Sequence, residues 1–199
     1  MIAALTLAGA IFAASTEKPL FNADERRSLL GGFADCVVEI HPKAAAKYVA
    51  EFGAKGGGNA ISDGACLPPN RNISIESMNL KYYGLVFAFS DAFIRAGRKP
   101  NITFELPKTW PKSDLGKQIL LTVEFAKCVV SHDRETARAL SKSQIASSAE
   151  LTATKALSKT FGACGAAEVT LLAGPALRGP IAYVLLQSDN ADQAMQVIS

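Results

Sequence analysis

The chain has 199 residues, 49% of them hydrophobic and 20% charged, so it can build an ample core and is not disordered over most of its length. Its 21 basic and 18 acidic residues leave a net charge of only +3, which does not indicate a nucleic-acid-binding protein. No apolar run reaches the roughly 18 residues of a membrane-spanning helix, which excludes a multi-span membrane protein.

Residues 1–15 have the pattern of a secretory signal peptide. The run from Ile2 to Ala14 consists of apolar and small residues, and small residues precede a cleavage position after Ser15. The run contains no Lys or Arg, so a buried N-terminal helix is the alternative interpretation. If cleavage follows Ser15, we expect a periplasmic or secreted protein without a stable membrane span.

Two segments repeat one pattern. The letters FADCVV at 33–38 recur as FAKCVV at 125–130, an offset of 92 residues. Further on, Cys66 matches Cys164, and Leu80-Lys81 matches Leu177-Arg178. The four cysteines are therefore two copies of a two-cysteine pattern, which predicts a duplicated unit. We expect the first unit at 16–98, a proline-containing linker at 99–112, the second unit at 113–190 and a tail at 191–199.

The first unit begins with a clear helix signal. Asn22 can cap a helix and Glu25 can complete a capping box, and apolar residues at helical spacing continue to about Ile40. Pro42 can open a short second helix, because proline is tolerated in a first turn. The stretch 76–96 is apolar on nearly all sides, which predicts a central, buried helix.

The second unit is expected to contain the same helices and one more. Glu150 can complete a capping box at the start of the extra helix, residues 168–172 allow a short strand, and a frayed polar tail is expected after Ser188. The residues that mark the starts of its four helices are Ser113, Asp133, Ser147 and Pro175. The chain is thus predicted to be mainly α-helical, with two tandem pseudo-symmetric units packed as one domain.

Four cysteines in an exported chain favour disulfides. Of three possible connectivities, the duplication selects a bridge inside each unit, Cys36–Cys66 and Cys128–Cys164. Buried free thiols are the alternative, because Cys36 and Cys128 lie on apolar helix faces. We expect no metal site, since there is no close cysteine pair and no matched histidine, and no cofactor.

No catalytic motif is present. Ser131, His132 and Asp133 are consecutive at a helix end, so their side chains diverge and cannot form a relay. Lys81 and Arg178 occupy matching positions at the starts of the closing helices, which suggests a pair of anion-binding positions. The alternative is that each cation pairs with a neighbouring helix or lies along it.

The repeated residues resemble uncharacterised exported alphaproteobacterial proteins with a duplicated cysteine-and-helix unit. This resemblance implies an envelope location and a helical fold, and it brings no catalytic residues. We therefore expect a non-enzymatic module that binds a partner protein or a small ligand. The alternatives are an enzyme with dispersed site residues, such as Glu124, His132 and Asp133, or a thiol–disulfide protein. The residues that carry the resemblance are Phe33, Cys36, Val37, Cys66, Phe125, Cys128, Val129, Cys164, Leu177, Arg178 and Gly179.

Overall fold

The computed structural model describes residues 22–51, 64–67, 82–100, 102, 104, 114–165 and 174–196. In these ranges the chain forms α-helices and short 3-10 helices, which confirms the mainly helical fold. The predicted signal segment, the possible strand at 168–172, Lys81 and Ser113 lie outside the described residues. Among the described helices, none has the length and apolar character needed to cross a membrane.

The N-terminal group of helices follows the predicted cap signals. It contains α1 (Ala23–Ile40), α2 (Pro42–Ala50), the short η1 (Gly64–Cys66) and α4 (Tyr82–Arg95). The Asn22 side chain accepts a hydrogen bond from the Glu25 N–H at 2.9 Å, and the Glu25 carboxylate accepts one from the Asn22 N–H at 2.9 Å. The capping box is therefore confirmed, and Pro42 stands in the first turn of α2 as expected.

The C-terminal group contains α5 (Asp114–His132), α6 (Arg134–Lys142), α7 (Ser148–Phe161), η3 (Gly174–Leu177) and α8 (Arg178–Gln196). Asp133 caps α6 by accepting a hydrogen bond from the Thr136 N–H at 3.0 Å, as predicted. Pro175 lies in η3, so the closing helix starts at Arg178. The expected polar tail after Ser188 is wrong, because α8 continues to Gln196 and Asp189 is buried.

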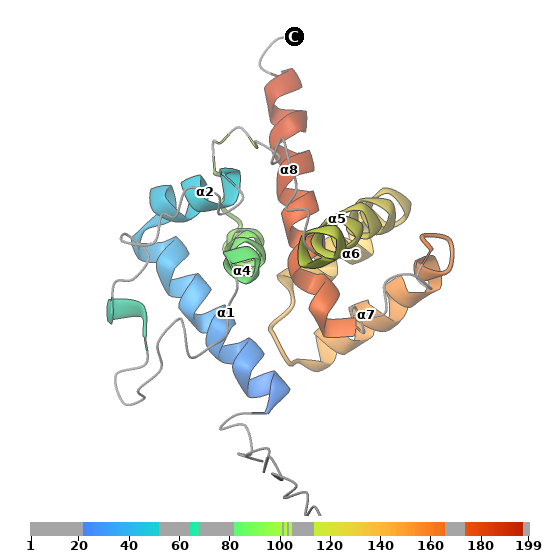
Figure 1. Cartoon of the computed structure of the whole chain (residues 1–199), viewed down its shortest axis with the longest axis horizontal. Helices are drawn as coiled ribbons and strands as arrows, with labels where there is room; N and C mark the ends of the chain where they lie inside the picture. The colour runs from blue at the N-terminus through green and yellow to red at the C-terminus, as the bar shows by residue number, and fades with distance from the viewer. Residues whose placement is uncertain are drawn as a thin grey trace, which may run out of the picture.

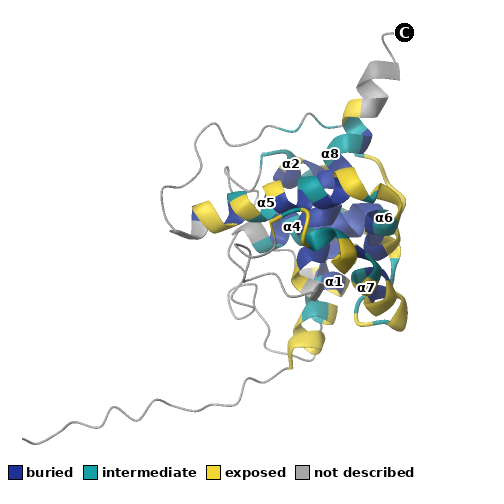
Figure 2. Ribbon diagram, turned by 90° about the vertical axis from the view of Figure 1, so that its right-hand side faces the viewer, coloured by how far each residue is buried: buried dark blue, intermediate teal, exposed yellow. Residues whose placement is uncertain are grey.

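The two closing helices, α4 and α8, form the centre of the fold. They pack against each other, with α1 and α2 on α4, and with α5 and α6 on α8 (Figure 1). Figure 2 shows that the buried residues gather where these helices meet. The largest fully buried side chains include Phe89 and Phe93 of α4 and Tyr183, Ile181 and Leu185 of α8. The prediction of a central, buried closing helix is confirmed for α4.

A glycine allows α8 to approach α4 closely. A Cβ atom at Gly179 would lie only 2.7 Å from the Cβ of Phe87. A side chain at this position would therefore force the helices apart or displace Phe87. Gly179 thus belongs to the packing of the two central helices.

Both predicted disulfides are present. Cys36 of α1 bonds to Cys66 of η1, and Cys128 of α5 bonds to Cys164 in the turn that follows α7. No cysteine is left free, so the free-thiol alternative is wrong. Two disulfides fit an oxidising compartment outside the cytoplasm.

Candidate functional site

A network of six charged side chains joins the two groups of helices. Each member is linked to another by an ion pair, and three guanidinium groups are matched by three carboxylates. The members, called the charge network below, are Arg27 and Asp35 of α1, Asp91 and Arg95 of α4, Glu150 of α7 and Arg178 of α8. The charges of these six side chains balance, which lowers the cost of burying them. The exposed Asp24 adds one further ion pair, to Arg27 at the edge of the network.

Arg178 is the centre of this network, and its side chain is only 4% exposed. Its Nε donates to the Asp91 carboxylate at 2.9 Å, and its Nη1 donates to the Ser143 hydroxyl at 3.0 Å and to Glu150 at 3.2 Å. Its Nη2 donates to the backbone carbonyls of Ser141 at 2.9 Å and Ser143 at 2.6 Å. A guanidinium has five N–H donors, so protein groups engage all of them.

Arg178 therefore has no N–H donor left over for an anion, as the anion-binding hypothesis would require. The contacts match the alternative interpretation, in which the cation pairs with a neighbouring helix. Lys81, its partner in the sequence pattern, lies outside the described residues. Anion binding by this pair of residues stays a prediction.

Only one of the two hydrogen bonds of the predicted capping box at the start of α7 is present. Ser147 accepts a hydrogen bond from the Glu150 N–H at 3.2 Å, but the Glu150 carboxylate turns to Arg27, Arg178 and the Ala146 N–H. Burial opposes ionisation of this carboxyl, yet the hydrogen bonds and charges outweigh burial and hold its pKa below the ordinary value. Desolvation by burial lowers the pKa of the Arg178 and Arg95 guanidinium groups.

A second ion cluster fixes α6 to α8. The Asp189 carboxylate, 7% exposed, accepts hydrogen bonds from Arg134 at 2.8 Å and from Arg138 at 2.6 and 2.9 Å. Burial alone would raise the pKa of Asp189. The hydrogen bonds and charges of Arg138 and Arg134 have the larger opposite effect, so the pKa of Asp189 lies below its ordinary value. This cluster explains why α8 remains ordered beyond Ser188.

A cavity of about 290 Å³ opens beside the charge network. It lies between α1, the first half of α4 and the start of α8, and its walls are mostly apolar. Three members of the charge network, Arg27, Asp91 and Arg178, supply its charged groups. The described residues that line it are Arg27, Leu30, Gly31, Gly84, Phe87, Ala88, Asp91, Ile145, Ala176, Arg178, Gly179 and Pro180.

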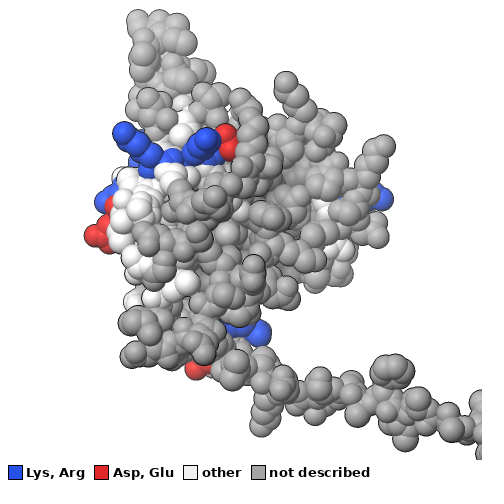
Figure 3. All heavy atoms as spheres, turned by 60° about the vertical axis from the view of Figure 1, so that its left-hand side comes forward, with Lys and Arg blue, Asp and Glu red and all other residues white. Residues whose placement is uncertain are grey.

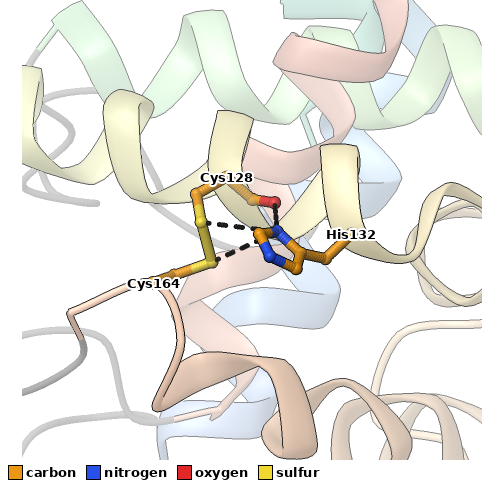
Figure 4. Close-up of side chains that lie close together, drawn as sticks. All are labelled: Cys128, His132 and Cys164. Atoms are coloured by element: carbon orange, nitrogen blue, oxygen red, sulfur yellow. Dashed lines mark hydrogen bonds between the residues drawn. A yellow bond between two sulfur atoms is a disulfide. The ribbon is translucent and has the colours of Figure 1, made fainter.

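A histidine lies against the second disulfide (Figure 4). The His132 Nδ1 is 3.6 Å from the Cys128 Sγ and 4.0 Å from the Cys164 Sγ. Together the three side chains bring one possible ligand atom each to within 4.8 Å of one another. The two sulfurs are bonded to each other, however, so this arrangement offers no thiolate ligands to a metal ion.

The candidate catalytic residues are not brought together. Glu124 pairs with Lys127 at 2.8 Å, Asp133 is occupied by the Thr136 N–H, and His132 faces the disulfide. The Ser131 hydroxyl donates to the Cys128 carbonyl at 2.7 Å. The Ser131 hydroxyl also lies 3.4 Å from the His132 Nδ1, so these two side chains do not diverge as expected, but Asp133 does not join them.

Sequence reasoning missed the charge network, although one signal for it was present. Asp91 stands in the largely apolar sequence of α4, and a carboxylate on a buried helix requires a cation or hydrogen-bond donors. Helical spacing identifies one partner, Arg95 four residues on, but it cannot identify Arg178, which is 87 residues away. Comparisons of the chain with protein-family models, curated proteins and solved structures find no match.

Proposed function

We propose that this protein is an exported, non-enzymatic helical module that binds a small, mainly apolar ligand in the cavity beside the charge network. The observation that carries the proposal is the cavity itself, because its volume is close to the lower end of known ligand sites. Such sites combine apolar walls with a few fixed polar groups. Here, Leu30, Phe87 and Ile145 supply apolar walls and Arg27 supplies a polar edge.

The charge network keeps the cavity preformed. Arg178 and Asp91 bond to each other at the wall, and Arg27 pairs with Glu150. These residues come from four different helices, so their ion pairs fix the walls relative to one another. A preformed site loses less conformational entropy when a ligand binds.

A small ligand is favoured over a partner protein by the described surface. The exposed large hydrophobic residues Ile40, Leu121 and Leu151 belong to three different helices, α1, α5 and α7. On the face shown in Figure 3, acidic side chains lie near basic ones. Neither observation supports a large apolar or single-sign docking surface.

Export is supported by the two disulfides, which persist in oxidising compartments. The signal pattern of residues 1–15 is the second support. A periplasmic or secreted location brings the cavity into contact with molecules outside the cytoplasm.

The binding test uses octanoate, which has an apolar chain for the apolar walls and one carboxylate that would compete with the exposed Asp24 for Arg27. Isothermal titration calorimetry of the folded protein should show saturable binding with one molecule per chain. Ala88→Leu places a larger side chain in the cavity and should weaken binding about tenfold or more, since tenfold is only about 1.4 kcal/mol.

The matched control is Ala139→Leu, the same substitution at an exposed position of α6. It should leave octanoate binding unchanged. If octanoate does not bind, or if both variants bind it as the unsubstituted protein does, the cavity is not the ligand site. Circular dichroism of both variants checks that each remains folded.

A further inference from the structure

The surroundings of the two disulfides differ in one chemically important group. At the position four residues after Cys128 stands His132, while the matching position after Cys36 is Ile40. His132 is exposed and lies against both sulfurs of its disulfide, whereas Ile40 is a hydrocarbon side chain, 52% exposed. One disulfide therefore has a proton-carrying group beside it at a position where the other has none.

The backbone determines which hydrogen the imidazole presents. The His132 Nδ1 lies 2.9 Å from the Cys128 carbonyl oxygen, which can only accept a hydrogen bond. Nδ1 must therefore carry a proton. The same nitrogen is the atom within 3.6 and 4.0 Å of the two sulfurs, so the group beside the disulfide is an N–H donor.

We propose that Cys128–Cys164 is an exchangeable disulfide that reacts with an external dithiol, with His132 as the hydrogen-bond donor to its leaving thiolate, and that Cys36–Cys66 is a structural disulfide. This activity goes beyond ligand binding in the cavity. The partner is a dithiol reductant outside the cytoplasm, either a small molecule or a dithiol protein.

The first step is attack by a thiolate of the dithiol on the Cys164 sulfur. The Cys128–Cys164 bond breaks, a mixed disulfide forms at Cys164, and Cys128 leaves as a thiolate with the bonding electron pair. The His132 Nδ1–H, 3.6 Å from that sulfur, can turn from the Cys128 carbonyl to hydrogen-bond the thiolate and stabilise it, and water then supplies the proton that makes it a thiol.

In the second step, the other thiolate of the dithiol attacks the dithiol sulfur that is bonded to Cys164. This closes the disulfide of the dithiol and expels Cys164 as a thiolate. The expelled sulfur lies 4.0 Å from the same imidazole nitrogen. The dithiol loses two electrons and two protons and becomes a disulfide, while Cys128 and Cys164 gain them as thiols. Water carries the two protons from the dithiol to the leaving thiolates, and the His132 N–H stabilises each thiolate as it leaves without losing its own proton.

Access to the sulfurs differs in the same direction. Cys36, Cys128 and Cys164 are each partly exposed, whereas Cys66 is buried, with 8% exposure, so both cysteines of the second disulfide reach the surface and only one of the first does. Attack on a disulfide requires a direct approach to one sulfur. Cys128–Cys164 therefore offers two cysteines to an attacking thiolate where Cys36–Cys66 offers one, and it alone of the two has the His132 N–H beside its sulfurs.

The test is the rate of reduction of each disulfide in the folded protein by dithiothreitol, followed by alkylation and peptide mass spectrometry. A hydrogen bond to the leaving thiolate lowers the pKa of that thiol, and exchange is faster when the leaving thiol has a lower pKa. We expect Cys128–Cys164 to be reduced at least about tenfold faster than Cys36–Cys66. His132→Ile, which copies the residue of the first unit, should remove about tenfold from that rate alone.

His41→Ile is the matched control, since it removes the other histidine of the chain, five residues after Cys36 in the sequence. It should leave the reduction of Cys128–Cys164 unchanged. Equal rates for the two disulfides, an unchanged rate in His132→Ile, or the same loss in His41→Ile would each overturn the proposal. The Cys36–Cys66 rate in the same samples reports any general loosening of the fold, and slowing or speeding of both disulfides together in His132→Ile would also overturn it.

Discussion

Replacing Arg178 by methionine should greatly destabilise the protein, because it removes the centre of the charge network. Methionine keeps an unbranched apolar side chain but provides none of the five N–H donors. The carboxylates of Asp91 and Glu150, with side chains 6% and 4% exposed, would keep only Arg95 and Arg27 as ion-pair partners. The network would change from three cations and three anions to two cations and three anions.

The expected loss is about 3–5 kcal/mol of the free energy of unfolding, the usual cost of removing one partner from a buried ion pair. Two arginines remain beside the carboxylates, so the loss stays below the sum of the individual hydrogen bonds. The free energy of unfolding of a whole domain is only about 5–15 kcal/mol, so Arg178→Met should leave the folded state only marginally stable.

The assay is urea unfolding followed by far-ultraviolet circular dichroism, with both disulfides intact. The matched control is Arg26→Met on the exposed face of α1, which should change the free energy of unfolding by no more than about 0.5 kcal/mol. The double variant Asp91→Leu, Arg178→Met should recover part of the loss, because it also removes a buried anion. A loss below about 1 kcal/mol in Arg178→Met would refute the reasoning.

Acid should weaken the fold through Glu150 and Asp189. The folded state depresses both pKa values, so each contributes stability above its ordinary pKa of 4.5 or 3.8 and loses it as the pH falls through the lower folded value. The urea concentration at the midpoint of unfolding should therefore decrease as the pH is lowered below about 4.5. Glu150→Gln should make that decrease smaller. Gly179→Ala should cost about 1–3 kcal/mol by crowding Phe87, while Gly162→Ala, which has open space around it, should cost far less; urea unfolding compares them.

Helix starts could be predicted from the sequence where their determinants are local. The reciprocal bonds of Asn22 and Glu25 lie within three residues, as does the bond from Thr136 to Asp133. The disulfide pairing was also predictable, because the repeated cysteine pattern reduced three connectivities to one. The duplication itself remains an interpretation of the sequence.

The remaining features depend on partners far away in the chain. Glu150 has a local capping role in the sequence pattern, but Arg27, 123 residues away, takes its carboxylate instead. The polar sequence after Ser188 indicated a tail, yet Arg134 and Arg138, 55 and 51 residues from Asp189, hold that part of α8. Local propensity cannot specify such pairs, and the cavity depends on the same long-range packing.

The most direct test of the proposed binding function is amide nuclear magnetic resonance of the protein titrated with octanoate. We predict saturable shifts concentrated at the amides of cavity residues such as Gly31, Ala88 and Gly179. The exposed Ala139 on α6 should remain unaffected. Saturable shifts centred away from the cavity, or no shifts at any concentration, would contradict the account.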